Sequence, residues 1–119
     1  MRAFIAAAVL SLATGTVSAQ EVGGTYDVNG TNFDGSAYKG TATIEVTTST
    51  TCRIHWETGS TTSDGICMRN QNALAAGYAF SDGKIGLVVY EIMADGTLDG
   101  VWTVADQEGA GTEVLTPAN

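Results

Sequence analysis

Polar and apolar residues alternate along most of the chain after residue 20, and no stretch repeats with the spacing of a helix. In AYKGTATIEV (37–46), Tyr38, Ala42 and Ile44 share one face, while charged and hydroxyl side chains share the other. A period of two residues is typical of a half-buried strand. The pattern predicts eight strands, at residues 23–29, 37–47, 51–57, 63–69, 74–80, 85–93, 97–104 and 110–116.

Short turn signals separate these strands. Asp82-Gly83 and Asp95-Gly96 each lie between two apolar runs, which predicts two-residue turns of type I′, and residues 32–36 form a longer loop. Consecutive hairpins in a chain of this length favour an up-and-down antiparallel barrel, because closing the barrel leaves no edge strand exposed. We therefore expect an all-β, eight-stranded barrel of avidin-like or lipocalin-like architecture, with a β-sandwich as the alternative.

The two cysteines lie on neighbouring predicted strands. A turn centred on Gly59 and Ser60 places Cys52 directly opposite Cys67, close enough for a disulfide. Closing a loop of this length contributes about 3 kcal/mol of stability. The single histidine and two cysteines are too few ligands for a zinc site, and their spacing is not that of a redox C-x-x-C pair.

In CRIHWE (52–57), Cys52, Ile54 and Trp56 are expected to face inward. His55 then points outward, between residues of opposite charge. Catalysis by this histidine would need an orienting partner and a pocket, and the local sequence offers neither. We expect an ordinary surface histidine.

Strands 85–93 and 97–104 are apolar on both faces, so their orientation depends on the Asp-Gly turns. The segments DGSAYKGTATI (34–44) and DGTLDGVWTV (95–104) are similar, and matching Gly100 to Gly40 places Leu98, Trp102 and Val104 inward. A two-residue turn then places Leu87, Val89 and Glu91 inward with them. A stripe of apolar residues is then left outside, which is typical of a protein contact. This candidate outer interaction patch consists of Val88, Tyr90, Ile92 and Val101. The opposite orientation, with these residues in the core, fits the sequence equally well.

The same orientation predicts an interior ligand site. Its residues are Trp56, Tyr78, Glu91 and Trp102. A carboxylate inside a barrel is costly unless it is paired or lies at a wet mouth, so Glu91 would be a handle for a ligand. In the opposite orientation Glu91 lies in water.

The N-terminal residues resemble an export signal. Arg2 precedes an apolar run at residues 4–12, and small residues at 17–19 suit cleavage before Gln20. We expect residues 1–19 to be a secretory signal peptide and residues 20–119 to be one barrel domain in the periplasm or outside a bacterial cell.

The net charge and the absence of known catalytic motifs narrow the range of possible functions. The net charge is −8, which disfavours nucleic acid and anionic lipid as partners. The chain has no G-x-S-x-G, no H-E-x-x-H, no phosphate-binding loop and no dinucleotide fingerprint. We therefore expect a protein that is not an enzyme and that has no cofactor and no metal site.

Several segments are similar to a family of small exported bacterial proteins, some of which carry the label fibronectin-binding protein. The segments are GTYDVNGTNFDGSAYKGTATI, CRIHW, GICMRN, LVVYEIMADGTLDGVWTV and GAGTEVLTP. The resemblance covers most of residues 20–119 and implies adhesion, but it implies no active site.

These observations together predict an exported, non-enzymatic interaction module that contacts a protein partner or a second copy of itself. One alternative is a small-ligand carrier that uses the barrel interior. Another is an inhibitor of a basic periplasmic enzyme, which the negative charge alone suggests.

Overall fold

The computed structural model describes residues 21–118, and this part of the chain consists of strands and short loops. The strands in chain order are β1 (Gly24–Thr31), β2 (Ala37–Val46), β3 (Thr51–Thr58), β4 (Thr61–Asn70), β5 (Ala73–Phe80), β6 (Ile85–Ile92), β7 (Leu98–Val104) and β8 (Gly111–Pro117). All eight predicted strands are present, with boundaries that differ by one or two residues. The described part of the chain holds no helix that could cross a membrane.

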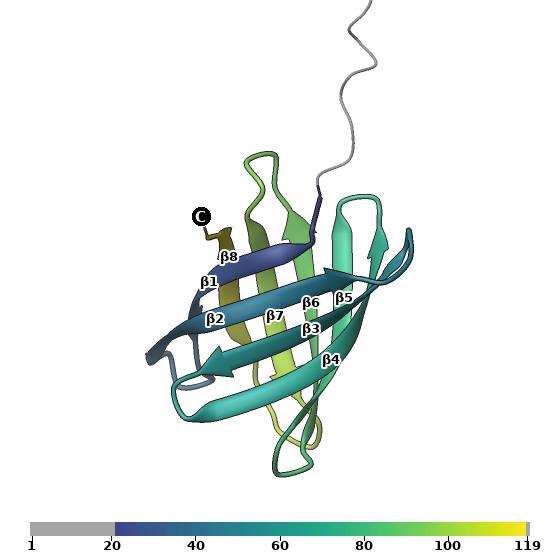
Figure 1. Ribbon diagram of the computed structural model, residues 1–119. Coiled ribbons are helices and arrows are strands. Elements are labelled where there is room, and N and C mark those ends of the chain that lie inside the picture. Colours follow the sequence, from purple (N-terminus) through teal and green to yellow (C-terminus); the bar gives the residue numbers. More distant parts are fainter. Residues whose placement is uncertain (1–20, 119) are drawn as a thin grey trace, which may run out of the picture.

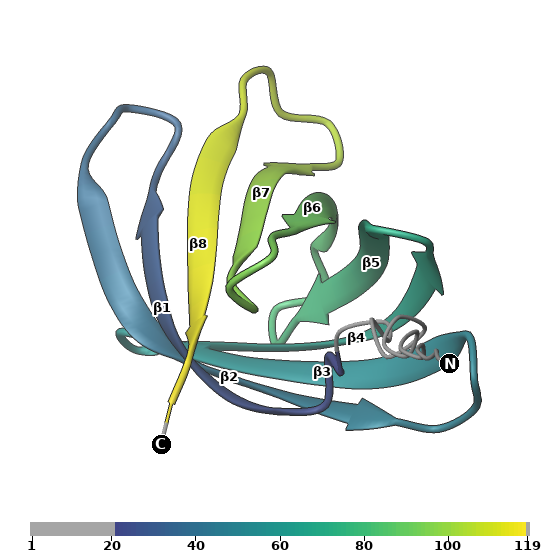
Figure 2. The same ribbon diagram turned by 90° about the horizontal axis from the view of Figure 1, so that it is seen from above.

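The strands form a closed antiparallel barrel in which each strand pairs with the next (Figures 1 and 2). β8 returns to pair with β1, so no sheet edge is left open. The predicted up-and-down barrel is therefore confirmed, and the sandwich alternative is wrong.

The two ends of the barrel differ in their loops (Figure 1). We call the end that carries the β1–β2, β3–β4, β5–β6 and β7–β8 loops the cavity end. The opposite, or disulfide, end carries the β2–β3, β4–β5 and β6–β7 loops together with residues 21–23. Val22 is buried at this end, where its carbonyl accepts a hydrogen bond from the Tyr26 hydroxyl at 2.8 Å. The expected signal peptide, residues 1–19, lies outside the described residues.

Three Asp-Gly hairpins share one loop conformation, which at β5–β6 and β6–β7 is longer than the two-residue turn expected from sequence, whereas the β1–β2 connection was expected to be a longer loop. In the β5–β6 hairpin, the Phe80 amide donates to the Lys84 carbonyl at 2.8 Å. The Gly83 amide donates back to the Phe80 carbonyl, and Gly83 has φ +94°. The loop is thus a type I turn followed by a glycine in the left-handed region. The β1–β2 and β6–β7 loops repeat these hydrogen bonds at residues 32–36 and 93–97.

The extra loop residue shifts the register of β6 by one at each side, so the orientation on which the outer patch was based is wrong for this strand, and the opposite orientation, which the sequence left open, is the one observed. Tyr90 lies opposite Gly100, not Val101, and Tyr78 lies opposite Gly86, not Leu87. A shift of one residue turns every side chain of a strand to the other face. Because β6 is shifted by one residue against both neighbours, β5 and β7 keep their expected orientation relative to each other. The inward faces of β5 and β7 are therefore as predicted.

Most of the predicted outer interaction patch therefore lies in the core. Val88, Tyr90 and Ile92 are buried, and only Val101 is on the outside, at 56% exposed. Leu87, Val89 and Glu91, which were expected inside, face solvent. An apolar outer surface does exist on these strands, but Val101 is the only residue of the predicted patch that contributes to it.

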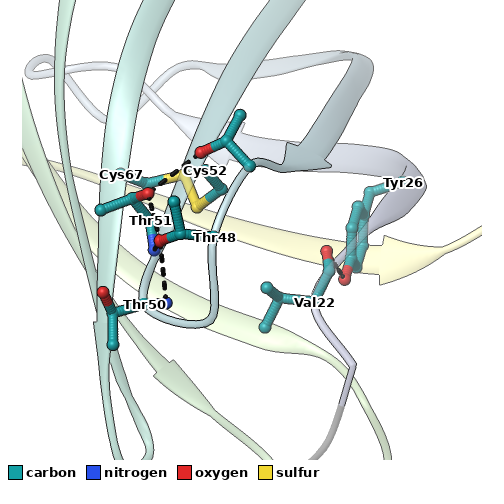
Figure 3. Close-up of a disulfide and its surroundings, with 8 residues drawn as sticks. Val22, Tyr26, Thr48, Thr50, Thr51, Cys52 and Cys67 are labelled. Atoms are coloured by element: carbon teal, nitrogen blue, oxygen red, sulfur yellow. Dashed lines mark hydrogen bonds between the residues drawn. A yellow bond between two sulfur atoms is a disulfide. The ribbon is translucent and has the colours of Figure 1, made fainter.

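The predicted disulfide joins Cys52 on β3 to Cys67 on β4, at the disulfide end (Figure 3). The two residues are directly opposed, with their Cα atoms 4.9 Å apart, because the β3–β4 turn is the expected two-residue turn. Both cysteines are buried. The neighbouring β2–β3 loop is held by hydroxyl bonds, among them Thr48 to Thr51.

Four interior aromatic rings lie over a glycine of the neighbouring strand. In each pair, a Cβ added to the glycine would fall within 2.5 Å of the ring, so only glycine leaves room. The pairs are Tyr38 with Gly30, Tyr78 with Gly86, Tyr90 with Gly100, and Trp102 with Gly111. The rings therefore cover the barrel wall, and part of the lumen stays empty.

Candidate ligand-binding cavity

A cavity of about 360 Å³ occupies the cavity end of the barrel. Its rim is the β3–β4 turn, where Thr58 to Thr61 border it, and the side chain of Ser63 lies below the rim. Its wall is mostly aromatic: Tyr38, Trp56, Tyr78, Phe80 and Trp102. This volume lies at the small end of the range for sites that bind small molecules.

The aromatic wall consists of two groups of rings in contact. On one side Tyr78 touches both Trp56 and Phe80, with ring centroids 5.0 and 5.5 Å apart. On the other side Trp102 touches Phe33 at 4.9 Å and Tyr38 at 6.1 Å. Because the rings support one another, the wall of the cavity is preorganised.

Glu113 on β8 is the charged residue among those that line this cavity, and it is only 6% exposed. Its Oε1 accepts a hydrogen bond from the Tyr38 hydroxyl at 2.7 Å, and its Oε2 accepts one from Trp56 Nε1 at 3.0 Å. The Tyr90 hydroxyl also donates to Oε2. The donors come from β2, β3 and β6, so the carboxylate joins strands that are far apart around the barrel.

The tyrosines around Glu113 are held in their donating form. Burial raises the pKa of the Tyr38 and Tyr90 hydroxyls far above the usual value, and the nearby Glu113 carboxylate raises both further. Burial and then Glu113 also raise the pKa of Tyr78, whose hydroxyl donates to the Thr103 carbonyl at 3.0 Å. These hydroxyls stay protonated at any physiological pH.

Three of the four residues predicted for an interior ligand site do meet in this cavity. Trp56, Tyr78 and Trp102 line it together. Glu91 does not, because the register of β6 places it on the outer face, opposite Asp99.

The sequence interpretation missed Glu113, which is the buried interior carboxylate that was expected at Glu91. The signal was present in GTEVLTP (111–117), where Glu113 alternates with Gly111 and Leu115. Leu115 is completely buried, so the alternation places Glu113 inside as well.

His55 lies on the outer face, as predicted, but it has orienting partners that the sequence did not reveal. Its Nδ1 lies 2.6 Å from the Asp64 carboxylate and its Nε2 lies 3.2 Å from that of Glu57. Hydrogen bonds to Asp64 and then to Glu57 raise the pKa of the imidazole. His55, Asp64 and Glu57 face away from the cavity. Although Asp64 precedes a glycine, it lies within β4 and not in a turn.

Comparisons with known proteins support the fold. No protein-family model matches the chain, and no curated protein matches it. A redesigned β-barrel is 14% identical, with a TM-score of 0.74, over 82% of this chain and 92% of that chain. A redesigned β-barrel bound to DFHBI is 18% identical, with a TM-score of 0.69, over 80% and 94%. A fatty acid transporter is 13% identical, with a TM-score of 0.54, over 82% and 96%.

At these identities the similarity establishes the barrel fold alone. The resemblance to exported bacterial proteins remains a prediction from the sequence. The disulfide is compatible with an oxidising compartment outside the cytoplasm.

Proposed function

We propose that this protein is an exported, non-catalytic barrel that binds a small molecule inside its cavity end. The observation that carries the proposal is the cavity of about 360 Å³, with its aromatic wall and the buried Glu113 carboxylate. An apolar pocket with few, well-placed polar groups is the usual form of a small-molecule site. Similar barrels bind DFHBI or transport fatty acid, which supports a binding role for this architecture.

Filling the cavity is expected to abolish ligand binding. Ser63 is buried and lines the cavity, so Ser63→Phe places a ring in the space that a ligand would occupy. Thr62→Phe is the matched control, because Thr62 is the exposed neighbour on the same strand. Binding of a neutral aromatic dye, followed by the fluorescence of Trp56 and Trp102, should fall at least tenfold in Ser63→Phe only. Equal affinities in the two variants would count against the site, and native mass spectrometry of the purified wild type would show any retained ligand.

The outer surface favours a second function, contact between two copies of the chain. Six large apolar side chains of β4, β6 and β7 are between 56% and 67% exposed, and we call them the outer apolar band. The band consists of Ile66, Met68, Ile85, Leu87, Val89 and Val101. Side chains of this size supply a large share of the roughly 800 Å² per partner that a standard interface buries.

The shape of the outer apolar band suits a second copy of the same surface. Outward positions on β5 are small, Ala75, Gly77 and Ala79, and they pair with larger outward side chains of β4 and β6. A twofold axis would place the β6 side chains of each copy against the small β5 side chains of the other. We therefore propose a symmetric homodimer as the occupant of this surface.

A lysine in the outer apolar band is expected to dissociate this dimer. Val89→Lys places a charge at its centre, whereas Thr43→Lys, on the polar outer face of β2, is the matched control. Sedimentation equilibrium should give a monomer for Val89→Lys and dimers for the wild type and Thr43→Lys. Added salt should strengthen the dimer, since each copy has a net charge of −8. A wild type that stays monomeric at high concentration and high salt would refute the dimer.

A further inference from the structure

We propose that the ligand of the cavity is an organic cation, a protonated amine on an aromatic or apolar body. This inference depends on the proposed function, because it names the class of small molecule that the same cavity would select. It rests on the Glu113 carboxylate, the aromatic wall and the charges of the loops at the cavity end.

Glu113 is a buried acid whose recorded partners are all neutral. Tyr38, Trp56 and Tyr90 donate to it, and none of the ion pairs recorded between residues 21 and 118 includes it. A buried carboxylate is costly in free energy unless an opposite charge or enough donors accompany it. A cationic group in the cavity would supply the missing positive charge.

The two carboxylate oxygens are unequally used. Oε2 accepts from both Trp56 and Tyr90, whereas the side-chain donor recorded on Oε1 is the Tyr38 hydroxyl. Each carboxylate oxygen can accept about two hydrogen bonds. Oε1 therefore keeps the capacity to accept one N–H from an ammonium group, and Glu113 lines the cavity.

The wall around this carboxylate also favours a cation. Trp56, Tyr78, Phe80 and Trp102 line the same cavity, and the faces of aromatic rings attract organic cations. The apolar body of such a ligand would bury surface against these rings, while its amine reaches Glu113.

The other loops of the cavity end carry more acidic than basic residues. The loops of the cavity end contain four acids, Asp34, Asp82, Asp106 and Glu108, and one base, Lys84. Lys84 lies 3.5 Å from the Asp82 carboxylate, so its charge is partly offset. Acidic loops near the opening raise the local concentration of cations and repel anions.

The same features argue against an anionic ligand such as a fatty acid. A ligand carboxylate at the base of the cavity would face the Glu113 carboxylate at close range, and like charges in a desolvated site repel strongly. This cavity would therefore select a different ligand from that of the fatty acid transporter whose fold it shares.

Three ligands of matched shape test the inference: a protonated arylalkylamine, the corresponding neutral alcohol and the corresponding carboxylate. Their affinities are measured by the quenching of Trp56 and Trp102 fluorescence, with calorimetry as a second readout. In the wild type the amine should bind at least tenfold more tightly than the alcohol, and the carboxylate should bind most weakly. In Glu113→Gln the preference for the amine should fall to near unity, while the alcohol still binds.

The outcomes separate this inference from the proposed function. Equal binding of amine and alcohol by the wild type, or tighter binding of the carboxylate, would overturn the cation preference and leave a ligand-binding cavity. Failure of the neutral dye and of all three ligands to bind would overturn the proposed function itself. If Glu113→Gln does not fold, as judged by circular dichroism, the wild-type ratio of amine to alcohol still decides the question.

Discussion

Replacement of Cys52 and Cys67 by alanine is expected to lower the free energy of unfolding by about 3 kcal/mol. The disulfide closes a loop with a sequence separation of 15 residues, so its loss gives the unfolded chain more conformational freedom. Urea denaturation followed by tryptophan fluorescence measures the change. Reductant should reproduce the loss in the wild type and should not affect the alanine variant.

The disulfide and the cavity lie at opposite ends of β3 and β4. Under conditions in which the alanine variant stays folded, its affinity for the neutral dye should therefore match that of the wild type. An unchanged urea midpoint in fully reduced wild type would show that the cross-link contributes little.

Gly100→Val is expected to destabilise the barrel by about 1–3 kcal/mol, the usual cost of overpacking a core. A Cβ at this position would lie 2.5 Å from Cδ1 of Tyr90, which is almost completely buried and cannot move aside. Because the Tyr90 hydroxyl donates to Glu113, the displaced ring should also weaken ligand binding. Chemical denaturation and dye titration measure the two effects.

Gly77→Val is the matched control for Gly100→Val. Gly77 lies on the outward face of β5, where the nearest atom to an added Cβ is Leu87 Cδ2 at 3.7 Å. Valine favours strands more than glycine does, so this variant, measured at a protein concentration too low for the proposed dimer, should be as stable as the wild-type monomer or slightly more stable. Equal losses of stability in the two variants would contradict the packing explanation. They would show that position 100 needs glycine for its backbone conformation and not for the space under the Tyr90 ring.

Cavity and fold depend on the same aromatic–glycine pairs. Tyr38, Tyr78 and Trp102 each lie over a glycine and also line the cavity. A larger residue at any of these glycines would push the ring toward the barrel axis. The pairs thus let a small barrel keep bulky aromatic side chains and an empty space at the same time.

The local sequence was sufficient to predict which side chains face inward where polar and apolar residues alternate regularly. In β2 and β3 one face is polar and the other apolar, so the inward positions of Ile44 and Trp56 followed directly. The β3–β4 turn has the minimum length, and the pairing of Cys52 with Cys67 followed from it. These features are local because each depends on one hairpin.

β6 shows where local reasoning fails. Its sequence IGLVVYEI is apolar on both faces, so alternation leaves two orientations open. The choice depends on one extra residue in each flanking loop, since a shift of one residue reverses a strand. Tyr90 was placed outside for this reason, although it is one of the most buried residues of the barrel.

The sequence by itself determined the number of strands, the antiparallel order, the cross-link and three of the aromatic residues of the cavity, because all of these depend on periodicity and on short turns. Only the tertiary structure decided the register of β6 and the meeting of Glu113 with Tyr38, Trp56 and Tyr90. Those four residues come from four strands and are brought together across the lumen by closure of the barrel. No local pattern encodes that contact, because it depends on the curvature and register of all eight strands at once.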